Sequence, residues 1–219
     1  MHTFEEIKQN ETVNTYITRA DESLAMLGYT EHSFAHVTRA AEVSGYILET
    51  LGFPERDIEL AKISGYLHDI GNLVNRDNHS LSGAVMAFRM LDNMGFEASD
   101  IATITTAIGN HDEGTGVPVN HVCAALILAD KSDVRRSRVR NSETSKFDIH
   151  DRVNYSVRKS ELKINEEHTI IKLKLTIDTK YGSVMDYFEI FLGRMIMCRK
   201  AAEQLGMQFK LIINEQQLI

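Results

Sequence analysis

Histidine and aspartate residues recur between positions 36 and 130, several of them beside apolar residues. His68 and Asp69 close an apolar helical segment just before Gly71, and Asp130 ends the apolar run ALILAD. A buried carboxylate must be paired or bind a cation, because an isolated charge is costly in an apolar interior. The residues that share this character are His36, His68, Asp69, His79, His111 and Asp130. They are candidate ligands of a metal.

The elements that must position these residues are helices. From residue 12 to about residue 140 the apolar positions repeat at helical spacing, and segments end at Gly28, Gly52 and Gly71. Helical bundles build metal sites from side chains that project inward from facing helices. Imidazole suits zinc, iron, manganese, cobalt or nickel, and carboxylates widen that range to magnesium. Taken alone, the His68-Asp69 pair is more often a capping aspartate beside a hydrogen-bonded histidine. Six such residues on successive helices favour a shared metal site.

The order H…HD…H…H…D resembles the HD-domain superfamily of metal-dependent phosphohydrolases, over roughly residues 30 to 140. The resemblance implies a mainly α fold, an HD-type helical bundle with the metals at one mouth. It implies that a first metal is held by His36, His68, Asp69 and Asp130. In two-metal members Asp69 would bridge to a second metal held by His79 and His111. The expected cofactor is therefore one or two divalent ions of Fe, Mn, Co, Ni, Zn or Mg.

Two departures from related motifs narrow this expectation. Some relatives carry HDIGK, but Asn72 occupies the lysine position here. Relatives that cleave cyclic dinucleotides carry HH and GYP, whereas this chain has His111-Asp112 and Gly116-Val117-Pro118. These differences argue against cleavage of cyclic di-GMP.

The predicted activity is hydrolysis of a phosphate ester or anhydride, in a nucleotide or dinucleotide, by a metal-activated water. Metals screen the phosphate charge and lower the pKa of a bound water. The proposed catalytic residues are Asp69 and His68, with Arg39 and Lys131 as cations for the substrate. Arg39 follows His36 by one helical turn, and Lys131 follows Asp130 directly. Asp112 and Asp133 are weaker candidates for the pocket.

Two other functions fit the same ligands. Some members of the superfamily use this set for di-iron oxygenase chemistry. A non-catalytic, metal-bound sensor or scaffold is the third possibility. Other charged residues have simpler interpretations: His32 and His150 as surface or packing residues, and the cluster of Arg135, Arg136, Arg138 and Arg140 as a solvated face.

Composition limits the class of protein. The net charge of −7 over 219 residues disfavours non-specific binding to duplex nucleic acid. The two cysteines, Cys123 and Cys198, lie in apolar runs and are expected to be buried, reduced thiols. The N-terminus has no apolar signal core, and no run approaches the roughly 20 apolar residues that span a bilayer. We expect a cytoplasmic protein that binds a small phosphorylated substrate and no membrane.

Near residue 154 the periodicity changes. IIKLKLTID alternates, with Ile171, Leu173, Leu175 and Ile177 on one face, which is typical of a half-buried strand. The tail therefore predicts a small C-terminal α+β appendage of strand–strand–helix–strand. This gives two units, a metal-dependent phosphohydrolase domain at 1–150 and a C-terminal module at 151–219. The module is expected to pack on the body or on another copy, so a homo-oligomer is a possible partner state.

Overall fold

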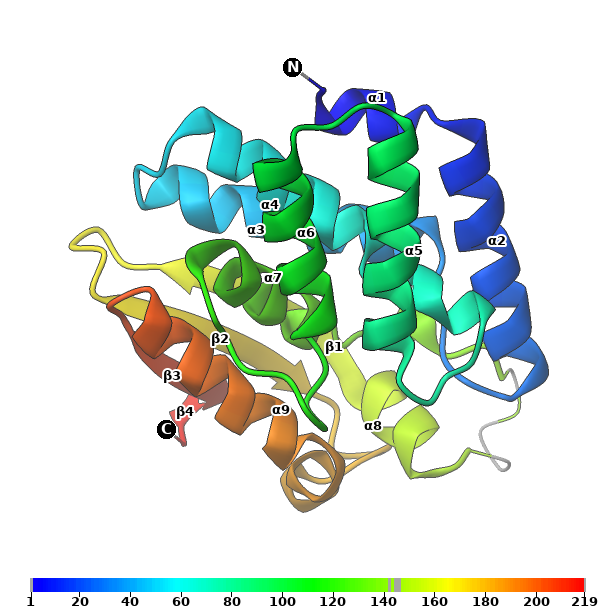
Figure 1. Ribbon diagram of the computed structural model, residues 1–219. Coiled ribbons are helices and arrows are strands. Elements are labelled where there is room, and N and C mark those ends of the chain that lie inside the picture. The colour runs from blue at the N-terminus through cyan, green and yellow to red at the C-terminus, as the bar shows by residue number, and fades with distance from the viewer. Residues whose placement is uncertain (1, 142, 144–146, 219) are drawn as a thin grey trace.

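The computed structural model describes residues 2–141, 143 and 147–218 (Figure 1). Its body consists of helices α1 (Phe4–Lys8), α2 (Glu11–Met26), α3 (Phe34–Thr50), α4 (Glu55–Leu67), α5 (His79–Asn93), α6 (Ala98–Gly109) and α7 (His121–Ser132). A short 3₁₀ helix, η1 (Ile70–Leu73), follows α4. A second one, η2 (Arg136–Arg138), and helix α8 (Ile149–Ser156) follow α7. The predicted mainly α body is confirmed.

Local sequence signals explain where these helices begin and end. The side chain of Asn10 accepts the backbone N–H of Val13 at the start of α2, and Asn120 caps α7 in the same way. Gly28 and Gly52 end α2 and α3 with φ of 82° and 75°, a conformation that glycine adopts without strain. Gly71 is different, because α4 ends at Leu67 and Gly71 lies inside η1. The prediction that Gly71 stops this helix is wrong.

Gly71 instead allows a close approach between two elements. A Cβ atom at this position would overlap the carbonyl oxygen of His79 and the backbone nitrogen of Gly83, both in α5. The missing side chain therefore lets η1, which follows Asp69, pack directly against the first turns of α5. This contact brings Asp69 and His79 into the same region of the molecule.

The C-terminal residues form a four-stranded sheet with one long helix. Strands β1 (Val157–Ile164), β2 (Ile170–Ile177), β3 (Gln208–Ile213) and β4 (Gln216–Gln217) lie in that order. β1 and β2 are antiparallel, whereas β2 and β3 are parallel and are connected through α9 (Val184–Gln204). The predicted strand–strand–helix–strand order is confirmed, and the short β4 extends it.

The apolar face of the sheet and one side of α9 pack onto the helical body. Leu173 of β2, Met195 of α9 and Leu128 of α7 belong to one continuous cluster of buried apolar residues. In Figure 1, α9 (orange) runs along the lower left of the molecule, beside the strands of the sheet. The module is thus attached to the body through a shared core, and the division into units at residue 150 stays a prediction.

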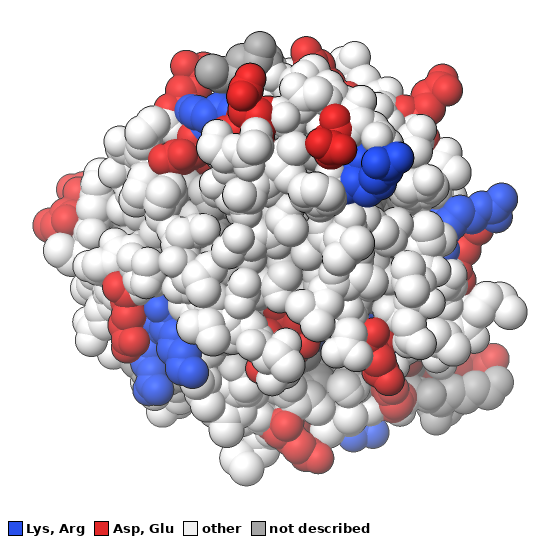
Figure 2. Space-filling view, viewed as in Figure 1, with Lys and Arg blue, Asp and Glu red and all other residues white. Residues whose placement is uncertain are grey.

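The surface carries both signs of charge. On the face in Figure 2, acidic and basic side chains are scattered among uncharged residues, with no broad patch of one sign. In the part of the chain that the structure describes, no helix is long and apolar enough to cross a membrane.

Candidate metal centre

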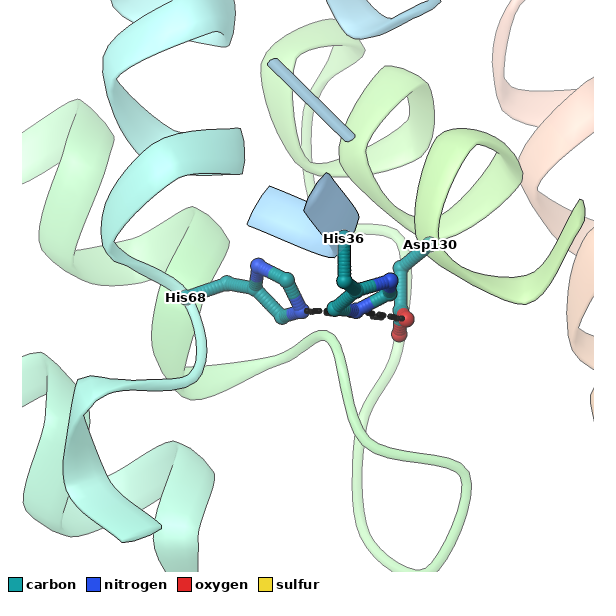
Figure 3. Close-up of side chains that lie close together, drawn as sticks. All are labelled: His36, His68 and Asp130. Carbon is teal, nitrogen blue, oxygen red and sulfur yellow. Dashed lines mark hydrogen bonds and ion pairs between the residues drawn. The ribbon is translucent and has the colours of Figure 1, made fainter. Parts of the chain in front are cut away.

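Four of the six candidate ligands meet at the end of α4. The Nε2 atom of His36, in α3, lies 3.2 Å from Nε2 of His68, the residue that ends α4. Oδ2 of Asp69 lies 3.4 Å from His36 Nε2 and 3.2 Å from His68 Nε2. Oδ1 of Asp130, in α7, is 3.4 Å from His36 Nε2. Figure 3 shows His36, His68 and Asp130 pointing toward one another from three different elements.

The remaining two candidates form a second group beside the first. His79 is the first residue of α5, and His111 follows the C-terminal end of α6; their Nε2 atoms are 3.2 Å apart. Oδ1 of Asp69 lies 3.6 Å from Nε2 of His79. Asp69 therefore presents one carboxylate oxygen to each group. Ligand atoms of His68, Asp69 and His111 all lie within 4.8 Å of one another.

The outer nitrogen of each imidazole has its own acceptor. Nδ1 of His36 lies 2.8 Å from Oδ2 of Asp133, and Nδ1 of His68 lies 2.8 Å from the carbonyl oxygen of Gly65. Nδ1 of His79 lies 3.1 Å from the carbonyl oxygen of Arg76, and Nδ1 of His111 lies 2.7 Å from that of Ile108. A carbonyl oxygen can only accept, so Nδ1 must carry the proton in these rings. In the neutral imidazole the Nε2 lone pair then faces the cluster.

This arrangement fits a bound cation. Four imidazole Nε2 atoms and two carboxylates face one another in a region where His36, His68 and His111 are at most 1% exposed. Lone pairs cannot hydrogen-bond to one another, and Oδ2 of Asp69 is buried without a hydrogen-bond partner. Such a donor set needs positive charge, which a divalent metal supplies and for which imidazole and carboxylate are suitable ligands. The clusters could hold a metal, and the ligand roles of the individual residues stay predictions.

The protonation pattern shows the same need for positive charge. Burial opposes the charged form of His36 and His68, but neighbouring carboxylates outweigh it and raise the pKa of His36 to about 9 and of His68 to about 10. Burial lowers the pKa of His111 well below its usual range, with the charges of His68 and Lys131 adding to the effect. Burial opposes ionisation of Asp69, yet the charge of His68 holds its pKa well below the ordinary value.

Asp133 orients the first group from behind. Its side chain is 0% exposed and accepts from Nδ1 of His36 and, at 2.8 Å, from Nε of Arg135. Arg39 reaches the same carboxylate, with Nε at 3.1 Å from Oδ1, and its Nη2 donates to the Ser160 carbonyl of β1. The sequence made Asp133 only a weak candidate; in the structure it directly follows the last residue of α7, Ser132, and no longer has helical backbone angles. Arg39 thus contacts Asp133 behind His36 and does not face the open side of the cluster.

Arg138 does not lie on a solvated face. It is 4% exposed, and its guanidinium donates to the carbonyl oxygens of Glu31, at 2.9 Å, and Asp133, at 2.8 Å. The prediction of a solvated arginine cluster is therefore wrong for this residue. Its side chain has to satisfy carbonyls of two loops that meet behind Asp133, a contact that sequence spacing does not reveal.

A pocket of about 330 Å³ opens over the cluster. Asp69, His79, His111 and Asp130 line it, together with Lys131, which bonds to Asp130 at 2.8 Å and to Glu113 at 2.6 Å. Lys131 thus lines the pocket, and its role toward a substrate stays a prediction. His32 and His150 also line the pocket, although the sequence suggested surface or packing roles. Neither has a partner in the ordered motif, so no sequence signal marked them.

With this geometry established, comparison with known proteins identifies the family. Residues 33–173, more than half of the chain, match the HD domain. The chain belongs to the HD-domain family. An uncharacterized protein of Methanocaldococcus jannaschii is 27% identical over 191 residues, which cover 76% of this chain and 73% of that protein.

Two further relatives share only part of their length with this HD-domain protein. Ribonuclease Y 1 of Pediococcus pentosaceus is 28% identical over 125 residues, which cover 56% of this chain and 22% of the ribonuclease. A crystal structure of a predicted HD superfamily hydrolase from an uncultured Thermotogales bacterium is 24% identical, with a TM-score of 0.44, over 57% of this chain and 67% of that one. Membership of the HD-domain family supports a metal-dependent phosphohydrolase in general terms.

Proposed function

We propose that this HD-domain protein hydrolyses a phosphate ester or anhydride bond of a nucleotide or dinucleotide with the help of two divalent metals. The observation that carries the proposal is the convergence of four Nε2 atoms and two carboxylates beneath a pocket whose lining includes Arg76, Lys131 and Arg194. Imidazole and carboxylate hold the metals, and arginine and lysine are suited to the phosphate groups of a substrate.

The residues divide into two overlapping ligand sets. His36, His68, Asp69 and Asp130 would hold the first metal. His79 and His111 would hold the second, and the Asp69 carboxylate would contribute to both. When bound, the metals screen the phosphoryl oxygens and supply a nucleophilic water near neutral pH by lowering its pKa.

The chain fixes the orientation of Asp69 through Asn72. Nδ2 of Asn72 donates to Oδ1 of Asp69 at 3.0 Å and to its carbonyl oxygen at 2.9 Å. Oδ1 of Asn72 in turn accepts from Nη1 of Arg76 at 3.2 Å. An amide thus stands where some relatives have a lysine, and Arg76 supplies the cation four residues later, in the loop between η1 and α5. Through Asn72, Arg76 is also a positioning residue for Asp69.

Lys131 and Arg39 have different parts in this proposal. Lys131 lies at the pocket, where its ammonium group can meet a phosphoryl oxygen while it neutralises Asp130 and Glu113. Arg39 acts through Asp133, which orients His36, so it is a positioning residue. The likeness to Ribonuclease Y 1, whose name indicates action on RNA, supports a phosphodiester among the bonds to be tested.

The test is a substrate panel with a matched pair of variants. The wild-type protein is assayed with Mn²⁺, Fe²⁺, Co²⁺, Ni²⁺ and Mg²⁺ on phosphomonoesters, nucleoside triphosphates, dinucleoside polyphosphates and a single-stranded RNA oligonucleotide. Asp69→Asn should abolish hydrolysis and metal binding, whereas Asp92→Asn, the same change at an exposed site in α5, should alter neither. Full hydrolysis by Asp69→Asn would refute the mechanism.

Two results would redirect the assignment. Oxygen consumption by the Fe²⁺ protein, without phosphate release, would favour the oxygenase alternative. Two bound metals with no turnover of any compound in the panel would favour a non-catalytic sensor or scaffold.

A further inference from the structure

The pocket over the metal centre is not closed by the helical body alone. Part of its lining comes from residues after 147, namely Asp148, His150, Asp151 and Asn154 at α8 and Phe191 and Arg194 in α9. In Figure 1 these two helices run along the lower side of the body, below α5 and α7. The C-terminal residues therefore reach the space in which a substrate would lie.

Arg194 is held in place but keeps unused hydrogen-bond donors. Its Nε atom lies 3.0 Å from Oε1 of Glu113, and its guanidinium carbon lies 4.4 Å from the centre of the Phe191 ring. The side chain is 23% exposed. Within the described residues, neither of its terminal nitrogens has a hydrogen-bond partner. A guanidinium fixed on one edge and open on the other is suited to binding an oxyanion.

The charges around Arg194 leave it only partly neutralised. Asp130, Lys131, Glu113 and Arg194 form a continuous chain of ion pairs at 2.8, 2.6 and 3.0 Å. If Asp130 is a ligand of the first metal, its charge is committed to that ion. Glu113 is then the one carboxylate that the two cations of this chain, Lys131 and Arg194, share.

A second guanidinium in the same pocket, that of Arg76, has no carboxylate partner among the residues that the structure describes. Arg76 lines the pocket, donates to the Asn72 amide and lies 5.6 Å from the centre of the Tyr29 ring. Among the described residues it makes no ion pair with an aspartate or glutamate. Two arginines, one from the segment before α5 and one from α9, therefore offer free donors to the same space.

We propose that Arg194 and Arg76 form a second anion subsite, which binds a phosphate group of the substrate other than the one attacked at the metals. The preferred substrate then carries at least two phosphate groups, as nucleoside polyphosphates and dinucleoside polyphosphates do. The C-terminal module is in this way the element that selects the substrate. The inference rests on the proposed function for the identity of the reacting group, but the subsite itself can be tested by binding.

The test uses a probe that cannot be hydrolysed. Isothermal titration calorimetry of the metal-loaded protein compares methylenediphosphonate, with two linked phosphonate groups, with methylphosphonate, which has one. The wild type should bind the diphosphonate more tightly. Arg194→Gln should weaken binding of the diphosphonate by roughly ten- to a hundred-fold, the usual effect of losing charge-assisted hydrogen bonds. Binding of methylphosphonate should change by much less.

Arg199→Gln is the matched control, because Arg199 is an exposed arginine of the same helix that does not line the pocket. It should bind both probes like the wild type. Circular dichroism checks that each variant is folded. If Arg194→Gln fails to fold, Arg194→Lys gives the decision: lysine keeps the positive charge beside Glu113 but lacks the free edge of the guanidinium, so a smaller loss that is again selective for the diphosphonate is expected there.

The proposal is overturned if the wild type shows no preference for the diphosphonate, or if a folded Arg194→Gln protein keeps that preference. These outcomes are separate from the fate of the proposed function. A protein that binds the probe through Arg194 but hydrolyses nothing in the substrate panel would retain the subsite and lose the phosphohydrolase assignment. Hydrolysis with an unchanged preference in Arg194→Gln would do the opposite.

Discussion

Replacement of Asp133 by asparagine tests whether the metal centre depends on the residues behind it. The carboxylate is fully buried and accepts from Nδ1 of His36 at 2.8 Å, while Arg39 and Arg135 lie at 3.1 and 2.8 Å. Asparagine keeps the size but has one acceptor oxygen where the carboxylate has two. If the amide nitrogen faces His36, the ring must carry its proton on Nε2 and loses the lone pair that would bind the metal.

The expected loss follows from these contacts. Even if the amide oxygen faces His36, the imidazole loses the negative partner that makes it a stronger ligand. Removal of such an outer partner commonly lowers metal affinity or activity by about 10–100-fold. That range corresponds to roughly 1.4–2.7 kcal/mol in binding free energy. The second group, His79 and His111, has no contact with Asp133 among the described residues and should keep its affinity.

Competition with a chromogenic chelator measures both affinities, and circular dichroism confirms that the helices remain. Asp92→Asn, an exposed substitution with the same change of charge, is the control and should bind like the wild type. A folded Asp133→Asn protein with wild-type affinity at the first site would refute the reasoning.

Three other perturbations have defined outcomes. Gly71→Ala should lower the free energy of unfolding by about 1–3 kcal/mol in urea titrations, because the added Cβ would push α5 away. The control is Gly193→Ala, at a helical site with open space around it, which should not lower that free energy. Equal stability of the two variants would contradict this packing. Joint replacement of His79 and His111 by alanine should reduce the metal count by about one per chain in elemental analysis, and an unchanged count would remove the second site. Burial raises the pKa of Cys123 from 9.0 to about 11. The stability that the buried neutral thiol contributes is therefore complete below pH 9 and is lost as the pH rises through about 11. Iodoacetamide should label the native thiol slowly at pH 8, and rapid labelling at that pH would count against this burial.

The sequence pointed to the candidate site where a polar residue ends an apolar run. Asp130 ends a run of buried residues in α7, and His68 ends the buried face of α4. Because burial demands a partner for each of them, their positions alone indicated that something must neutralise or bind them. The alternation from Ile171 to Ile177 likewise predicted which face of β2 is buried, and the structure confirms it.

Contacts between distant segments could not be predicted in this way. The periodicity of α9 indicates that one side is buried, but it does not say that the helix packs on α7. Nothing in the sequence distinguishes Arg194 from other charged residues, and only the fold places it beside Glu113. Gly71 shows the same limit. A glycine after a helix predicts a stop, whereas here the backbone of α5 occupies the space of its missing side chain.

The two parts of the pocket come from separate stretches of the chain. All six candidate metal ligands lie between residues 36 and 130, whereas Phe191 and Arg194 belong to a helix that begins at Val184. Under the proposed function, reactivity and selectivity can change independently in evolution, because substitutions in α9 would alter what fits in the pocket and leave the candidate metal ligands in place. For protein engineering, α9 is accordingly the helix to randomise when a different substrate is wanted from the same metal centre.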